Sequence, residues 1–188
     1  HAPHKTALQA KTTKTGYVLN GRKVFVLDAH VADQFIVLAR TAGVAGEEAG
    51  LSLFLVDAST KGVSTERVVM VDSRNSGNVV FDNVAVDAAA LLGELHAGCD
   101  DLQQVLDVAN IGLSAELLGL SIEAFERTLS YLKERKQFGE LIGSFQGLQH
   151  RAAEMYAELE LARSIVLKAL HAVDSNADNV AILASACK

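Results

Sequence analysis

The sequence predicts a multi-domain α+β protein, in which an antiparallel β-barrel or sandwich is followed by an antiparallel helix-bundle segment. Short β-branched and aromatic runs, separated by turn residues, fill residues 16–87 without a helical pattern between them. From about residue 99 the apolar residues recur at three- and four-residue steps instead. Long helices with short connections pack antiparallel. We therefore expect one domain at residues 1–95 and a second at residues 96–188.

The strand region opens with GYVLNGRKVFVL, in which Asn20 and Gly21 separate two apolar runs. Asn and Gly tolerate the positive φ of a tight turn, so these two residues predict a β-hairpin. Four later runs predict further strands, with the loop TAGVAGEEAG between the first two. These runs are QFIVLAR (34–40), LSLFLVD (51–57), GVSTERVVMV (62–71) and NVVFDNVAVD (78–87).

The second region predicts three helices. The first begins near Cys99 and continues to about Gln137, and its middle is apolar on most faces, so it should be buried on several sides. The second is amphipathic. The polar segment 174–179 carries capping residues, and the third helix should begin near Val180. The apolar stripe of the second helix consists of Leu148, Ala152, Met155, Leu159, Ala162, Val166 and Leu170.

Composition argues against several classes of function. The net charge of -6 is unlike that of a nucleic-acid-binding surface. The two cysteines and six histidines have no metal-ligand spacing, so no metal site is expected. We expect no membrane segment, because polar residues interrupt the longest apolar run, residues 105–125. The chain ends in NVAILASACK without a helix stop signal, which suggests part of a longer protein. Cytoplasm is the default location and a mitochondrial matrix the alternative.

The connection between the two long helices, RKQFGELIGSFQ (135–146), has an unusual composition. Arg135 and Lys136 fall in the last turn of the first helix, where the helix dipole favours cations. That role does not explain Phe138 beside Gly139 in an otherwise polar connection. An aromatic face next to a guanidinium can stack on a flat heterocycle and hold its phosphates.

Two amides strengthen this interpretation of the connection. Gln137 and Gln146 offer the donors and acceptors that a ribose or a ring edge needs. A purely structural turn, with Phe138 packed into the helix bundle, explains the residues equally well. The residue types alone leave both alternatives open.

The same stretch resembles the acyl-CoA dehydrogenase family. Residues 131–163 contain the family's Arg-x-x-Phe-Gly, then a Phe-Gln pair, then a helix with Met and Glu-x-Ala-Arg. Residues 16–40 are similar to the hairpin of its middle β-domain, and residues 79–94 to the exit from that domain into the helices. These stretches and their order extend over nearly the whole chain.

The resemblance implies a fold and a cofactor. Family members have an N-terminal helical domain, a β-barrel middle domain and a C-terminal four-helix bundle, with FAD between barrel and bundle. Arg135 would meet the pyrophosphate of an FAD held mainly by a neighbouring subunit, with Gln137 and Phe138 beside the nucleotide. Phe145 and Gln146 would lie near its adenine end. A dimer or tetramer is therefore implied.

The resemblance also implies a reaction, the α,β-dehydrogenation of an acyl-CoA thioester to the trans-2-enoyl-CoA. A glutamate removes the α-proton, the β-hydrogen leaves as hydride to flavin N5, and electron-transfer flavoprotein is the expected partner for reoxidation. The usual glutamate would lie beyond Lys188, so no catalytic residue is assigned here and the fragment alone is expected to be inactive.

Several positions depart from the family pattern. Phe25 stands where the family usually has Trp beside the flavin, and Leu27 where it has a Thr near N5. We assign both residues to the flavin site, but Leu27 offers no hydroxyl. Asn110 replaces an arginine that faces the CoA or acyl site, and Ala109 replaces the base of some members. A non-catalytic subunit of a heteromeric dehydrogenase and an acyl-CoA oxidase-like relative therefore remain alternatives.

Overall fold

A computed structural model describes residues 2–188, which form two compact units. The N-terminal unit ends at Leu102, and the C-terminal unit extends from Gln103 to Lys188. Helix α1 (Gly98–Glu134) begins in the first unit and continues through the second. A mostly antiparallel sheet followed by helices confirms the predicted α+β class.

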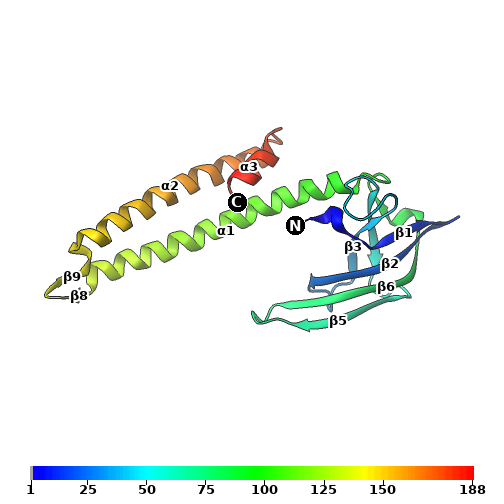
Figure 1. The fold of residues 1–188 in the computed structure, drawn as a ribbon, viewed down its shortest axis with the longest axis horizontal. Helices are drawn as coiled ribbons and strands as arrows, with labels where there is room; N and C mark the ends of the chain where they lie inside the picture. The colour runs from blue at the N-terminus through cyan, green and yellow to red at the C-terminus, as the bar shows by residue number, and fades with distance from the viewer. Residues whose placement is uncertain (1) are drawn as a thin grey trace. The chain divides into compact units, whose positions relative to one another are not determined.

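The N-terminal unit is built on one seven-stranded mixed sheet with the order β5-β6-β2-β1-β3-β4-β7 (Figure 1). Its neighbouring strands pair antiparallel, except for β1 and β3, which pair in parallel at Gln9 and Arg40. The strands are β1 (Gln9–Thr12), β2 (Gly16–Leu27), β3 (Gln34–Arg40), β4 (Leu51–Asp57), β5 (Val63–Val69), β6 (Asn75–Asp87) and β7 (Leu91–Leu92). Short 3-10 turns, η1 (Pro3–Lys5) and η2 (Ala88–Ala90), precede β1 and β7.

The core of this unit comes from side chains that alternate along the strands. The rings of Tyr17 and Phe54 meet edge to face, with centroids 4.9 Å apart. Successive side chains of a strand point to opposite faces, which lets one face pack inward. The fully buried large side chains of the sheet and its flanks include Leu8, Leu19, Val37, Leu51, Phe54, Val56, Val79 and Val84.

The prediction of a hairpin at Asn20-Gly21 is wrong, because β2 runs unbroken through both residues. The pairing of β2 with β6 shifts register just there, between Leu19 and Gly21. Gly21 has a φ of +142°, and a Cβ on it would lie 2.8 Å from the Cα of Leu8. Close approach of the chain before β1 therefore requires the glycine. The conformational freedom of the glycine backbone is therefore used in a β-bulge here and not in a turn.

The C-terminal unit contains three helices, as predicted, together with a short hairpin. Ile111 of α1 shares a buried cluster with Ala169 and Ala172, whereas the ring of Phe125 lies 6.2 Å from that of Tyr156. A residue nearer the start of α1 thus contacts residues nearer the end of α2, so the two helices run antiparallel (Figure 1). The elements after α1 are β8 (Lys136–Gln137), β9 (Glu140–Leu141), η3 (Ile142–Ser144), α2 (Gln146–Asp174) and α3 (Val180–Ala186).

The predicted burial of α1 on several sides is wrong for this chain. Large apolar side chains such as Val105 and Leu120 are more than half exposed, and Met155 on the predicted core stripe of α2 is 45% exposed. A helix that is apolar all round needs more neighbours than α2 and α3 supply. By length and composition α1 could also cross a membrane, a test that the core helix of a bundle passes as well.

Candidate functional site

The predicted connection at residues 135–146 is a β-hairpin followed by a 3-10 turn. Strands β8 and β9 pair antiparallel, and Phe138 and Gly139 form the two-residue loop between them. Their φ angles are +56° and +86°. Two consecutive positive φ values in a two-residue loop are characteristic of a type I′ turn. The backbone N–H of Ile142 donates to the carbonyl of Arg135 at 2.9 Å, which closes the base of the hairpin.

Phe138 stands at the tip of this hairpin with 90% of its surface exposed. Its ring meets that of Phe145 edge to face, with centroids 6.2 Å apart. The alternative in which Phe138 packs into its own helix bundle is therefore wrong. The exposed ring at the loop tip, together with the Phe145 ring at the start of α2, offers flat apolar surface to a ligand or another chain.

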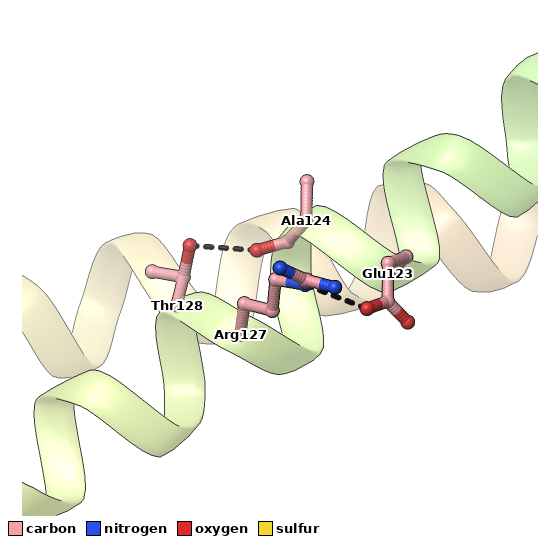
Figure 2. A network of polar contacts seen from close by, with 4 residues as sticks. All are labelled: Glu123, Ala124, Arg127 and Thr128. Carbon is pink, nitrogen blue, oxygen red and sulfur yellow. Dashed lines mark hydrogen bonds and ion pairs between the residues drawn. The ribbon is translucent and has the colours of Figure 1, made fainter.

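Arg135 is exposed, and its side chain makes no hydrogen bond or ion pair with residues 2–188. It follows the last residue of α1, so it lies just outside the helical turn in which it was expected. Arg127, two turns earlier, differs: its Nε donates to Glu123 Oε1 at 2.6 Å (Figure 2). The charge of Arg127 is thus used locally, whereas that of Arg135 is available to an anion.

The two predicted glutamines flank the aromatic pair along the chain. Gln137 is in β8, and Gln146 is the first residue of α2, directly after Phe145 at its N-cap. Both side chains are exposed. The hairpin and the start of α2 therefore bring together the five site residues predicted in this stretch, while their contact with FAD stays a prediction.

The other two predicted site residues lie in the N-terminal unit, near the end of β2. Phe25 has a φ of +52° and sits in a second register shift, between Lys23 and Val26. Lys23 pairs with Val79 and Val26 pairs with Gly77, so β2 has one more residue than β6 between these pairs. This extra residue makes a β-bulge in β2. Phe25 is 62% exposed and Leu27 is 64% exposed. The bulge leaves the Phe25 ring free of the sheet core.

Phe25 also lines an open groove of about 770 Å³ that sequence reasoning missed. Lys23 lies beside it, with Nζ donating to Thr6 Oγ1 at 2.6 Å. Burial lowers the pKa of Lys23 from 10.5 to about 8. In the sequence this lysine looks like a solvated turn residue of NGRK. Its burial depends on a segment 17 residues away along the chain, which no local pattern records.

Arg40 at the end of β3 is a second feature that the sequence did not reveal. It is 5% exposed, and its guanidinium donates four hydrogen bonds to backbone carbonyls. These bonds fix the loop 41–50 against η1, so Arg40 has a structural role. The acceptors are the carbonyl oxygens of His4, Ala42, Glu47 and Ala49, at 2.7–3.2 Å.

Comparison with known proteins supports the resemblance seen in the motifs. The family model of the acyl-CoA dehydrogenase middle domain matches residues 2–84, and that of the acyl-CoA dehydrogenase C-terminal domain matches residues 96–188. Together the two matches leave outside only residue 1 and residues 85–95, which hold the end of β6, η2 and β7.

Individual relatives agree with these matches. The mitochondrial short/branched chain specific acyl-CoA dehydrogenase of Bos taurus is 34% identical over 174 residues, 90% of this chain and 40% of that protein. Subunit CarC of the caffeyl-CoA reductase-Etf complex of Acetobacterium woodii is 33% identical, over 85% of this chain and 42% of that protein. PigA, solved with FAD and proline, superimposes with a TM-score of 0.87 at 30% identity, over 98% of this chain and 50% of PigA.

The chain spans about two fifths of the length of these curated relatives and half of the solved structure. Its sheet matches a middle domain and its helices match a C-terminal domain, in the order in which the motifs were found. The chain therefore belongs to the acyl-CoA dehydrogenase family of flavoprotein oxidoreductases, of which it carries portions of the middle and C-terminal domains.

Proposed function

We propose that this chain is part of an FAD-dependent acyl-CoA dehydrogenase, which converts an acyl-CoA thioester to the trans-2-enoyl-CoA. The single observation that carries the proposal is the hairpin tip, where the unpaired guanidinium of Arg135 accompanies the exposed ring of Phe138. Family membership gives the reaction class, and the hairpin supplies the chemistry that a dinucleotide needs.

The residues present fit FAD. Arg135 makes no ion pair with an acid among residues 2–188, so its planar fork can bind a pyrophosphate through paired hydrogen bonds. The rings of Phe138 and Phe145 give the heterocycle a flat contact surface, and Gln137 and Gln146 can hydrogen-bond polar edges. Bound FAD would supply the redox chemistry of thioester oxidation.

In this proposal the hairpin binds the FAD of a neighbouring subunit, so the functional protein is at least a dimer. Phe25, on the middle domain, takes the place beside the flavin that the family gives to tryptophan. Its exposure and its position in a bulge support that role. We further propose electron-transfer flavoprotein as the redox partner, which the Etf complex of the related CarC protein supports.

We assign α-proton removal to no residue of this chain. Ala109 occupies the position of the base that some family members use, and methyl side chains cannot accept a proton. What this chain contributes is binding: the guanidinium and the aromatic pair would fix the nucleotide, and fixed geometry removes an entropic cost from the reaction.

A second candidate function is a subunit that keeps the fold and binds the cofactor but has lost catalysis. Two substitutions favour it: Leu27 lacks the hydroxyl expected near the flavin, and Asn110 lacks the charge expected near the acyl-CoA. Bleaching of the flavin absorption when acyl-CoA is added to the purified complete protein under nitrogen would support the dehydrogenase. Bleaching that is reversed rapidly by oxygen alone would instead indicate an oxidase.

The cofactor-binding role is tested by Arg135→Ala in the complete protein. Loss of a charged hydrogen bond should weaken FAD binding by about 1–3 kcal/mol, or roughly 5- to 150-fold in Kd. Arg127→Ala is the matched control, because that exposed arginine already pairs with Glu123. Equal flavin retention after dialysis in the wild type and both variants would contradict the role of Arg135.

A further inference from the structure

We propose that Phe25 and Phe138 adopt a left-handed backbone conformation that lowers folding stability. In return, this conformation directs each aromatic ring toward a ligand. The inference rests on the proposed function in taking that ligand to be FAD. It adds what family membership does not give: a stability cost located at two named backbone positions.

Residue identity distinguishes these two phenylalanines from the other residues with positive φ. Among residues 2–188, seven non-glycine residues have positive φ. Five of them are Asp, Ser, Asn or His, the polar types that tolerate this conformation by bonding to nearby backbone. The other two are Phe25 and Phe138, which have no polar atom with which to do so. Both are residues that sequence reasoning had assigned to the flavin site. The polar five are Asp28, Ser73, Asn83, His96 and Asn176.

Burial among the described residues does not offset the backbone strain at either phenylalanine. Phe25 is 62% exposed and Phe138 is 90% exposed. A strained residue persists in a fold when packing or hydrogen bonding around it overrides the local preference. Phe138 has one aromatic neighbour, Phe145, with a centroid distance of 6.2 Å, and glycine would suit its turn far better. The gain that keeps phenylalanine at this position therefore lies outside the packing of residues 2–188.

Phe25 and Phe138 lie in different local structures that have the same effect on the side chain. Phe25 lies in a β-bulge and Phe138 in a type I′ turn, and both devices re-aim a side chain away from the direction of a regular strand. Two unrelated local structures in two different units thus reach the same outcome, an outward-facing phenylalanine at positive φ. A shared ligand type explains this convergence.

The test compares alanine and glycine at the same position in the flavin-free complete protein. At an ordinary position glycine is the less stable of the two, because its unfolded chain has more freedom. At a strained position the order reverses, since only glycine relieves the strain. We expect Phe138→Gly to melt above Phe138→Ala by about 1–2 °C, and the same order at Phe25. Tyr131, exposed on helix α1, is the control, and there alanine should melt above glycine.

Flavin affinity gives the readout that a merely structural role would not change. Both Phe138 variants lack the ring, so both should bind FAD roughly 5- to 150-fold more weakly than wild type, while the Tyr131 variants keep wild-type affinity. If alanine melts above glycine at both phenylalanine positions, the strain is absent and the inference fails on its own. If the order reverses but FAD affinity is unchanged in every variant, the link to the cofactor is refuted, and the proposed function loses its support from the hairpin.

Discussion

Replacing Lys23 by methionine should stabilise the fold at neutral pH. Its ammonium group is largely removed from water, and the one hydrogen bond found for it within residues 2–188 runs to Thr6 Oγ1 at 2.6 Å. No carboxylate of the described residues lies within ion-pair distance. Charge that is desolvated without a counter-ion costs free energy, and methionine fills a similar volume without that cost.

The magnitude follows from the pKa of Lys23. Its decrease from 10.5 to about 8 corresponds to about 3.4 kcal/mol, because one pKa unit is worth about 1.36 kcal/mol. Losing the bond to Thr6 removes about 1 kcal/mol of this gain. We therefore expect Lys23→Met to raise the free energy of unfolding at pH 7 by about 1–3 kcal/mol.

The dependence on pH has a definite sign. The folded-state pKa is below the unfolded one, so between pH 8 and 10.5 the unfolded chain binds more protons. Wild-type stability from this group therefore rises with pH across that window, and the full cost is present below pH 8. The advantage of Lys23→Met should disappear by about pH 10.5.

Urea unfolding at a series of pH values measures this, with fluorescence or circular dichroism as the signal. Other titrating groups are common to both proteins and cancel in the difference. Lys61→Met, at an exposed turn, is the control and should change stability little at any pH. A Lys23→Met protein that is less stable than wild type at pH 7, or whose difference from wild type is the same at pH 7 and pH 10, would refute the reasoning.

Three further substitutions test the fold. Gly21→Ala should cost about 1–3 kcal/mol, seen as a lower melting temperature, because its Cβ would meet Leu8 Cα at 2.8 Å. Arg40→Met should cost about 2–4 kcal/mol and accelerate amide exchange in the loop 41–50, since four carbonyls lose their donor. Met155→Ala should cost about 1 kcal/mol or less in the 188-residue chain, measured by urea unfolding, because this side chain is already 45% exposed.

The spacing of apolar residues along the sequence, together with residue type, was enough to predict most helices and strands of the fold. Strands β3 and β4 have the predicted bounds, because β-branched and aromatic runs there stand between polar loops. Strand β1 was missed, since its sequence QAKT has one buried residue, Ala10, and no β-branched run. Its place in the sheet comes from pairing with β2 and β3, which is long-range information.

The membership of the candidate site was easier to predict than its shape. The resemblance to the family motifs assigned Arg135, Phe138 and Phe145 to one site, and all three lie in the connection between α1 and α2. Their contact with FAD stays a prediction. The hairpin itself, with its positive φ at a phenylalanine, was not predicted, because propensity argues against that residue there. Where a local preference is violated without compensating packing, the reason is expected to be functional rather than structural.

Arg40 and Arg135 are the same residue type but have different hydrogen-bond partners, and only the partners indicate their roles. Arg40 and Arg135 each follow or end a regular element, and nothing in the sequence tells their roles apart. In the structure Arg40 is 5% exposed, and its two terminal nitrogens donate to four backbone carbonyls, so the fold uses four of its five donors and leaves Nε buried without a partner among the described residues. The side chain of Arg135 donates to no acceptor within residues 2–188, although an exposed arginine can pair within its own helix, as Arg127 does. An arginine that folding does not use keeps all five donors for a phosphate, which is the property that a pyrophosphate-binding hairpin requires.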